Sequence, residues 1–549
     1  MVEVRGDDFF KANINPILTQ KGDSLPVSAF TADGTVPVGT TKYEKRGTAV
    51  KVPSWDINKC IQCNQCSLVC PHAAIRPVLK TPEQIADAPA TFEVKDATGY
   101  KGYKFRIQVS PYDCTGCGSC ANVCPSKEKA LTMIPVAQAI DEQAANWDYA
   151  EKLPENDKVY KIDNPKGSQF SKPLFEFSGA CAGCGETPYV KLVTQLFGDR
   201  MIVANATGCS SIYGGSSPTC PYTVNDKGHG PAWANSLFED NAEFGYGMNL
   251  AVSQRRARLA EKVTALKELW ANDCAECAQI LQNWLDNMED AEGSKVASEK
   301  LIACLESCCA KEDCTSCECA TLCKEILEEK DCLVKKSIWI FGGDGWAYDI
   351  GYGGVDHVLA MNEDVNILVL DTEVYSNTGG QASKSTPTGS IAKFAASGKK
   401  TKKKDLGMMA MSYGYVYVAQ ISLGSNMAQA VKALKEAEAY HGPSIVICYA
   451  PCINHGINMS GSIAEMKKAV DCGYWSLYRF NPALADEGKN PFTLDSKDPT
   501  ADYKTFLLSE TRYSSLKKLF PDKADQLFEI NEAQAAERRE KYKNLAGQD

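Results

Sequence analysis

A chain of 549 residues has room for about three or four domains, and its net charge of −10 disfavours nucleic acid and anionic membranes as main partners. No stretch approaches the roughly 18 consecutive apolar residues of a membrane span, and the amino terminus lacks the apolar core of a signal peptide. We therefore expect a cytoplasmic protein whose 25 cysteines bind metal rather than form disulfides.

Residues 1–50 are rich in Gly, Thr, Pro and Lys and show neither a helical nor a strand period. A segment of this length is too short to bury a core of its own. We predict an arm that lies on the surface of another part of the protein.

Residues 51–140 contain the cysteine pattern C-x2-C-x2-C-x3-C-P twice. In two-cluster ferredoxins, each such run binds a 4Fe-4S cluster through its first three thiolates and gives its fourth to the other cluster. A pair of zinc sites, the alternative, lacks this proline-terminated pattern. We therefore predict an α+β dicluster ferredoxin-like domain. The ligands would be Cys60, Cys63, Cys66 and Cys124 for one cluster, and Cys114, Cys117, Cys120 and Cys70 for the other.

Residues 141–175 are polar and contain three prolines, which is typical of a linker between domains. The region 176–500 contains short apolar runs, which predict the buried strands of a doubly wound, mostly parallel α/β sheet. Two of these runs, 201–204 and 444–448, precede turns that carry Cys209 and Cys452.

The centre of this domain reads as a βαβ unit, with apolar strands at 338–341 and 365–370. The first strand leads into Gly343-Asp344-Gly345, and the second leads into a turn with Thr372, Val374 and Asn377. In open parallel sheets, ligands bind beyond the carboxyl ends of the strands, so these groups should meet in one crevice. Oxygen side chains and a carbonyl suit a Mg2+ ion that is shared with a diphosphate. Gly-Asp-Gly alone is also an ordinary turn.

The same geometry predicts a third cluster beside that crevice. If the strands are parallel neighbours, their carboxyl ends gather the turns of Cys209 and Cys452 near the C-x2-C pair Cys181 and Cys184. An isolated C-x2-C is as often a zinc site or a pair of buried thiols.

An insertion from about 253 to 332 interrupts the domain and holds ten of the 25 cysteines. Leu259, Val263, Leu266, Leu269 and Trp270 recur at helical spacing and predict a helical hairpin. Cys304, Cys308 and the C-x2-C-x-C-x3-C run from Cys314 are one candidate ligand set for zinc or a further cluster. We prefer a variable helical insertion whose thiols stay reduced or pair under oxidation.

Two further helical patterns complete the chain. The apolar positions from Met427 to Leu434 predict an amphipathic helix on the sheet, capped by Ser425 and Asn426. Residues 501–549 form a charged helical tail, and one role open to it is to clasp a neighbouring subunit.

Taken in order, these motifs resemble the carboxyl-terminal half of single-chain pyruvate:ferredoxin (flavodoxin) oxidoreductase. The resemblance covers nearly the whole chain, arm included. It rests on the two ferredoxin runs, Cys-Ala-Gly-Cys-Gly-Glu at Cys181, Gly-Asp-Gly-Trp-Ala-Tyr at Gly343 and Tyr-Ala-Pro-Cys-Ile at Tyr449. The Gly-Asp-Gly unit also resembles the general thiamine diphosphate motif, in which an Asn usually stands where this chain has Thr372. The oxidoreductase family has Thr at that position.

The resemblance implies roles for individual residues. Asp344, Thr372 and the Val374 carbonyl would bind Mg2+. Glu186, Cys209, Gly343, Gly345 and Asn377 would line thiamine diphosphate, with Asn377 as the candidate catalytic residue. Cys181, Cys184, Cys209 and Cys452 would bind the 4Fe-4S cluster nearest to the cofactor.

The implied activity is the oxidative decarboxylation of pyruvate, with coenzyme A as co-substrate, to acetyl-CoA and CO2. Thiamine diphosphate supplies the carbanion and the electron sink, and three 4Fe-4S clusters pass electrons one at a time to ferredoxin or flavodoxin. In the family, the Glu that activates the cofactor and the pyruvate-binding residues lie in the amino-terminal half. We therefore expect this chain to need a partner that carries that half, and we expect the complete unit to dimerise.

Two other functions stay open at this point. The first is a related 2-oxo acid:ferredoxin oxidoreductase with another substrate. The second is a pure iron-sulfur electron-transfer subunit, in which the Gly-Asp-Gly region is only structural and the purified protein contains no thiamine.

Overall fold

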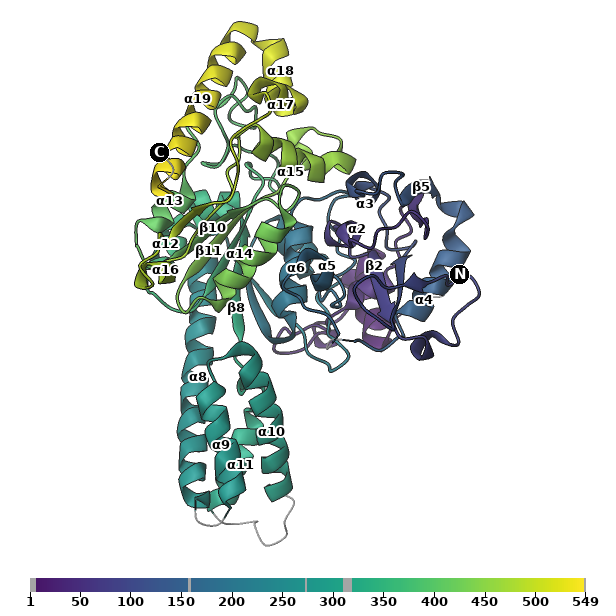
Figure 1. Cartoon of the computed structure of the whole chain (residues 1–549), viewed down its shortest axis with the longest axis vertical. Coiled ribbons are helices and arrows are strands. Elements are labelled where there is room, and N and C mark those ends of the chain that lie inside the picture. Colours follow the sequence, from purple (N-terminus) through teal and green to yellow (C-terminus); the bar gives the residue numbers. More distant parts are fainter. Residues whose placement is uncertain (1–5, 157–158, 272–273, 310–317, 548–549) are drawn as a thin grey trace.

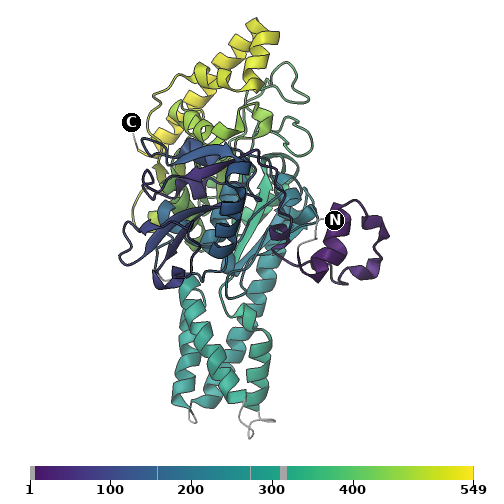
Figure 2. The same ribbon diagram turned by 90° about the vertical axis from the view of Figure 1, so that its right-hand side faces the viewer.

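The computed structural model describes residues 6–156, 159–271, 274–309 and 318–547. A ferredoxin-like unit lies beside a larger α/β unit, from which a bundle of helices projects (Figure 1). The first described helices of the chain, in purple, lie at the side of the molecule, away from the end of that bundle (Figure 2). None of the helices in the described part of the chain has the length and apolar character that a bilayer crossing requires.

In the described part of the arm, a π-helix (η1, Phe10–Ile14) leads directly into α1 (Asn15–Leu18), and the arm later runs along the α/β unit. There the Gly39 N–H donates to the Tyr222 carbonyl at 2.6 Å, and the Cys220 N–H donates to the Thr40 hydroxyl at 2.8 Å. The prediction of an arm on another surface is therefore consistent with these contacts.

A mixed sheet forms the centre of the α/β unit and contains, within the described residues, eight strands in the order β13-β12-β10-β11-β9-β8-β6-β7. The run from β10 to β7 is parallel, and β12 and β13 are antiparallel. The bounds are β6 Met201–Ala206, β7 Ala232–Ser236, β8 Ser337–Gly343, β9 Asn366–Asp371, β10 Tyr417–Ile421, β11 Ser444–Tyr449, β12 Tyr478–Phe480 and β13 Phe492–Leu494. Every residue of β9 and β11 is buried, as expected for parallel strands covered on both faces. The prediction of a mostly parallel α/β sheet is confirmed.

Helices cover both faces of this sheet (Figure 1). Helix α6 (Thr187–Phe197) contacts α14 (Met427–Ala439), and α8 (Asn241–Trp270) contacts α12 (Tyr352–Ala360). Asn426 caps α14 as predicted, because its side chain accepts the Gln429 N–H at 3.0 Å. Shorter helices of this unit are α7 Cys209–Ser211, α13 Leu406–Met411, α15 Ser462–Asp471 and α16 Ala483–Asp486.

The ferredoxin-like unit combines short helices with antiparallel strands. Strand β1 (Lys51–Trp55) pairs with β5 (Leu131–Pro135), and β4 (Lys104–Val109) pairs with β2 (Ile75–Lys80) and β3 (Lys95–Asp96). Helices α2 (Gln65–Leu68) and α3 (Ser119–Val123) lie within the two cysteine runs. The segment expected to be a linker contains α4 (Ile140–Ala150) and α5 (Pro165–Ser168). Trp147 of α4 is buried against Arg76, so α4 packs onto the ferredoxin-like unit.

The described residues between 253 and 332 form a bundle rather than the predicted hairpin. Cys314 and Cys317 of the candidate ligand set lie outside the described residues. The bundle's described helices are the outer part of α8, α9 (Ala275–Asn287), α10 (Ala291–Cys309) and α11 (Glu318–Glu328). Leu259 and Val263 are buried in a core of its own, whereas Leu269, predicted to share that face, is 38% exposed. The hairpin prediction was wrong because α9 and α10 also carry apolar stripes, with Trp284 and Leu301, that need covering.

The carboxyl-terminal helices α17 (Tyr503–Ser509), α18 (Thr511–Leu519) and α19 (Pro521–Leu545) pack on the α/β unit of the same chain. The Tyr542 hydroxyl donates to Asp405 at 2.8 Å, and the Asn531 amide donates to the Thr388 carbonyl at 2.6 Å. The buried face of the tail is thus used within the chain.

A buried ion network joins this tail to the end of β9. Arg512 lies 2.8 Å from Glu373 and 2.6 Å from Glu510, and Lys403 lies 2.8 Å from the other Glu373 oxygen. Burial opposes ionisation of Glu373, but Lys403, Arg512 and His455 outweigh it and lower its pKa to about 2. Because the folded pKa is depressed, this stabilisation is present above pH 4.5 and is lost as the pH falls towards 2.

Replacing Arg512 with alanine tests this network. Arg512→Ala leaves Glu373 short of one partner and Glu510 without its guanidinium, which should cost about 3–5 kcal/mol of stability. Thermal unfolding at neutral pH measures the loss. Lys504→Ala is the control, since it removes an exposed pair with Asp525 in the same tail and should leave the melting temperature unchanged. Equal melting temperatures for the two variants would show that the Arg512 network does not stabilise the fold.

Candidate active site and iron-sulfur sites

A cleft with an empty volume of about 350 Å³, its open mouth included, lies beyond the carboxyl ends of β6, β8 and β9. Its lining consists of residues 207–210, 343–346 and 374–378 together with Glu186 and Phe238. The turns after these strands meet here because the strands are parallel neighbours. The cleft therefore contains Cys209, Asp344 and Asn377, three residues that the sequence placed at one site.

Three oxygen atoms converge at the base of this cleft. The Thr372 hydroxyl oxygen lies 3.0 Å from Asp344 Oδ1 and 3.1 Å from the Val374 carbonyl oxygen. All three residues are buried, at most 3% exposed. Neighbouring ligands of an octahedral Mg2+ with bonds of about 2.0–2.1 Å lie about 2.9 Å apart. The spacing of these oxygens therefore fits three corners of such a site.

The electrostatic surroundings of the Asp344 carboxyl group also favour a bound cation. Burial raises the pKa of Asp344 well above its usual range, and the neighbouring Asp371 carboxylate adds to the rise. The Ser383 hydroxyl opposes it by donating to Asp344 Oδ2 at 2.6 Å. Lys403 pairs with Asp371 and Glu373. A divalent ion would place positive charge next to Asp344 and stabilise its ionised form.

Glu186 supplies a second buried carboxyl group to the cleft. It directly precedes α6 and is 4% exposed. Burial raises its pKa to about 7, and the Tyr213 hydroxyl opposes this rise by donating at 3.0 Å. Asn377, the candidate catalytic residue, lies at the exposed mouth of the same cleft.

Cys181, Cys184, Cys209 and Cys452 are neighbours, although they come from separate loops. Burial raises the pKa of Cys184, Cys209 and Cys452, and Glu186 raises each further. Cys181 also raises the pKa of Cys452, and both Cys184 and Cys452 raise the pKa of Cys209. These thiols ionise readily only beside positive charge, which suits ligands of an iron-sulfur cluster.

A close approach of two loops builds this cysteine set. The Gly185 N–H donates to the Pro451 carbonyl at 3.2 Å, and a Cβ at position 185 would lie 2.5 Å from that oxygen. Glycine at 185 therefore lets the loop of Cys184 reach the loop of Cys452. We call Cys181, Cys184, Cys209 and Cys452 the cysteine set, and the converging oxygens of Asp344, Thr372 and Val374 the oxygen set. Because Cys209 also lines the cleft, the two sets share a wall.

The ferredoxin-like unit brings cysteines of the two runs together in the two groups that the spacing predicts. A cavity of about 360 Å³ is lined by Cys70 from the first run and by Cys114, Cys117 and Cys120 from the second. In the other set, Cys124 of the second run lies close enough to Cys63 and Cys66 to raise their pKa, although burial is the larger cause.

The two units touch where a cluster loop of one meets a cluster loop of the other. Burial raises the pKa of Cys117, and the Gly183 N–H, which lies between Cys181 and Cys184 in the chain, opposes that rise by approaching the thiol. Burial lowers the pKa of His72 to about 4, and its ring contacts the backbone of Ser178 and Cys181. The Cys70–Cys120 cavity and the Cys181 loop are therefore adjacent.

Some residues of the site carried no sequence signal. Tyr213 and Ser383 hold the two buried carboxyl groups, and the Ser376 hydroxyl lies 3.2 Å from the Cys209 sulfur. Tyr213 and Ser383 belong to none of the motifs, and Ser376 lies inside the polar turn without a recognisable role. Only the tertiary structure brings them to the site.

Comparisons with known proteins agree with this division of sites. Residues 59–127 match the family described as a 4Fe-4S dicluster domain, and residues 330–448 match the C-terminal TPP binding domain of thiamine pyrophosphate enzymes. Residues 2–49 match EKR, a domain of unknown function. Over 541 residues the chain is 62% identical to the pyruvate:ferredoxin oxidoreductase of Moorella thermoacetica, covering 98% of this chain and 46% of that protein.

Two pyruvate-flavodoxin oxidoreductases are also similar. That of Enterobacter agglomerans is 55% identical over 545 residues, covering 98% of this chain and 46% of the relative. That of Klebsiella pneumoniae is 52% identical over 549 residues, covering 99% and 46%. The chain is homologous to part of the pyruvate:ferredoxin and pyruvate:flavodoxin oxidoreductases. It spans about half the length of these relatives, and the resemblance drawn from the motifs is confirmed.

Substitution of Asp344 tests the oxygen site. Asp344→Asn replaces the carboxylate among the three converging oxygens with a neutral amide. If Asp344 binds Mg2+, this change should weaken Mg2+-dependent binding of thiamine diphosphate at least about tenfold, measured by titration of cofactor-free enzyme. Asp349→Asn is the matched control. Asp349 lies in the π-helix η11 (Gly345–Ile350) that follows Asp344 and pairs with Lys384 at 3.0 Å, so the affinity of this variant for the cofactor should match the wild type. Unchanged affinity in the Asp344→Asn variant would exclude Asp344 as a ligand.

Substitution of Cys452 tests the third cysteine set. Cys452→Ser should lower the iron content from about twelve to about eight atoms per chain, because one cubane loses a thiolate. Cys448→Ala removes a buried thiol from the preceding strand β11, where the Sγ donates to the Val446 carbonyl of the same strand at 3.9 Å, and should leave iron unchanged. Iron analysis of protein purified without oxygen gives the answer. A full iron content in Cys452→Ser would show that this set holds no cluster.

Proposed function

We propose that this chain is the cofactor-binding and electron-transfer part of a pyruvate:ferredoxin (flavodoxin) oxidoreductase. The complete enzyme would convert pyruvate and coenzyme A to acetyl-CoA and CO2, and pass electrons one at a time to ferredoxin or flavodoxin. The observation that carries this proposal is the single cleft that contains both Asp344 of the oxygen set and Cys209 of the cysteine set. An electron-transfer subunit would need only the second of these.

When bound, thiamine diphosphate with Mg2+ supplies the carbanion and electron sink for decarboxylation, and three 4Fe-4S clusters supply one-electron acceptors. Asp344, Thr372 and the Val374 carbonyl would hold the Mg2+ ion and thereby orient the diphosphate. Glu186 and Asn377 line the same cleft. With a pKa of about 7, Glu186 can hold or release a proton near neutral pH.

The cysteines would be divided among three cluster sites. The sets are Cys60, Cys63, Cys66 and Cys124; Cys70, Cys114, Cys117 and Cys120; and Cys181, Cys184, Cys209 and Cys452. The contact between Cys117 and the Gly183 N–H supports a route from the cleft into the ferredoxin-like unit.

The domains would be the arm (1–50), the ferredoxin-like domain (51–140), a connecting segment (141–175), the thiamine-binding domain (176–500) and the tail (501–549). The relatives are about twice as long as this chain, which supports a partner half that binds pyruvate and completes the coenzyme A site. We expect a dimer of the complete unit in the cytoplasm.

Reconstitution tests this proposal. The chain alone should bind iron but show no coenzyme A-dependent oxidation of pyruvate, and addition of the partner half should restore turnover with ferredoxin or flavodoxin. A panel of 2-oxo acids, assayed with the complete enzyme, should favour pyruvate. The proposal would be contradicted if the purified complete enzyme contained no thiamine diphosphate. Full turnover by the isolated chain would contradict it as well.

A further inference from the structure

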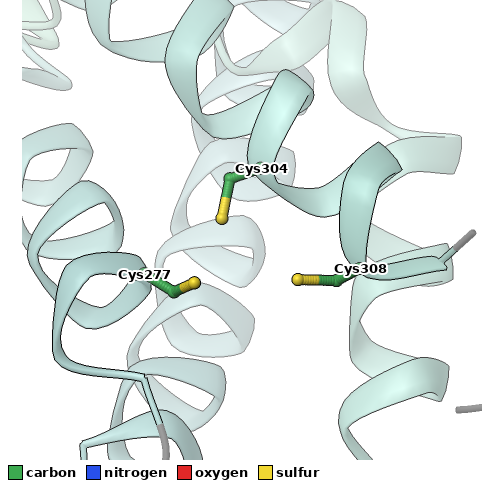
Figure 3. Close-up of side chains that lie close together, drawn as sticks. All are labelled: Cys277, Cys304 and Cys308. Atoms are coloured by element: carbon green, nitrogen blue, oxygen red, sulfur yellow. The ribbon is translucent and has the colours of Figure 1, made fainter. Parts of the chain in front are cut away.

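The outer end of the helical bundle gathers cysteines that none of the proposed cofactor sites uses. Cys277, Cys304 and Cys308 place their sulfur atoms within 4.8 Å of one another. Figure 3 shows the three side chains pointing from their helices towards a common centre. Cys274 is bonded to Cys277, so a fourth sulfur lies directly beside that of Cys277.

Local structure explains why these four thiols meet. Cys274 caps the start of α9, and the Cys277 N–H donates to its sulfur at 3.3 Å. Cys304 and Cys308 lie four residues apart on α10, so they share one face of that helix. Leu301 and Leu305 are buried in the bundle core, and Cys304 and Cys308 pack against that core at its outer end. The C-x2-C pair of one helix thus faces the C-x3-C pair of another.

We propose that Cys274, Cys277, Cys304 and Cys308, in their thiol form, bind one Zn2+ ion. Tetrahedral zinc with Zn–S bonds of about 2.3 Å separates its ligand sulfurs by about 3.8 Å. Three of the four sulfurs, those of Cys277, Cys304 and Cys308, already lie within 4.8 Å of one another. Cys274 would join them by rotation of its side chain once its bond to Cys277 is reduced. The thiols release their protons as the ion binds, and no electrons are transferred.

The ion and the Cys274–Cys277 bond are alternatives for the same two sulfurs. A cellular thiol reductant supplies two electrons and two protons, is itself oxidised to a disulfide, and converts the Cys274–Cys277 bond to two thiols. The ion then binds in place of the bond as the thiols lose their protons. The four residues form an all-cysteine ligand set with C-x2-C spacing on one side, a common composition of structural zinc sites.

The tight spacing favours a single ion over a further iron-sulfur cluster. A cubane holds its four thiolates at the corners of a larger tetrahedron than a single ion does. Among the described residues, this is the one group of three His, Cys, Asp or Glu side chains whose ligand atoms all lie within 4.8 Å. The three sets proposed as cluster ligands do not approach as closely. The spacing of the sulfur atoms therefore distinguishes the proposed zinc site from the three proposed cluster sites.

A metal here would add to the stability of the bundle, whose apolar core is small beside that of the α/β unit. Zinc supplies folding free energy to small units in which apolar burial is limited. The site would fasten the start of α9 to the end of α10, closing the bundle at the end distant from the sheet (Figure 1). Its role is thus structural and independent of the reaction proposed above.

Metal analysis of the complete enzyme, purified without oxygen in the presence of a phosphine reductant, tests the site. Wild-type enzyme should contain about one zinc per chain, with X-ray absorption at the zinc edge showing four sulfurs at about 2.3 Å. The double variant Cys304→Ser/Cys308→Ser should lose the zinc and keep its iron and thiamine diphosphate. Cys309→Ser is the matched control, since it changes the adjacent half-buried cysteine and should keep zinc at the wild-type level.

A conservative variant keeps the test decisive if the double variant fails to fold. Cys308→His offers a nitrogen ligand in the same place and should retain zinc, with three sulfurs and one nitrogen around it. Wild-type enzyme without zinc would overturn the proposal. An unchanged zinc content in the double variant would also overturn it. So would a double variant that loses about four iron atoms per chain and no zinc. Because iron and thiamine are measured in the same samples, failure of this site is distinguishable from failure of the proposed activity.

Discussion

The parallel register of four central strands is the constraint on which the site depends. In the ladder, Gly343 of β8 pairs with Leu370 of β9, and Asp371 of β9 pairs with Tyr449 of β11. Each strand ends at the same edge of the sheet, so Asp344, Thr372 and the loop of Cys452 all emerge there. A shift of one strand by a single residue would turn alternate side chains to the other face and separate these groups.

Behind this edge, buried charges hold the turns in place. Lys403 and Arg512 neutralise Asp371 and Glu373, and the His455 ring contacts the Thr372 carbonyl at 2.8 Å. His455 belongs to the segment that follows Cys452, and Arg512 belongs to the tail. The segment after Cys452 and the tail therefore both help to position Thr372. The stability of the tail is in this way connected to the geometry of the oxygen set.

Much of this arrangement was predictable because it depends on short sequence spacing. The ferredoxin runs specify their ligand exchange, and the apolar strands with polar turns indicate a shared crevice. The bundle was missed because the stripes of α9 and α10, with Trp284 and Leu301, were not weighed against that of α8. Tyr213, Ser383 and Arg512 were missed for a different reason. Each acts on a carboxyl group between 27 and 139 residues away, and no local pattern records such contacts.

The central claim is that an oxygen site for Mg2+ and a cysteine site for an iron-sulfur cluster share one wall at Cys209. Anomalous diffraction at the iron edge, from crystals of the complete enzyme with thiamine diphosphate and Mg2+ bound, tests it most directly. We predict an iron peak enclosed by Cys181, Cys184, Cys209 and Cys452, with the diphosphate in the adjoining cleft over Asp344. An iron peak elsewhere, with none among these four cysteines, would contradict the account.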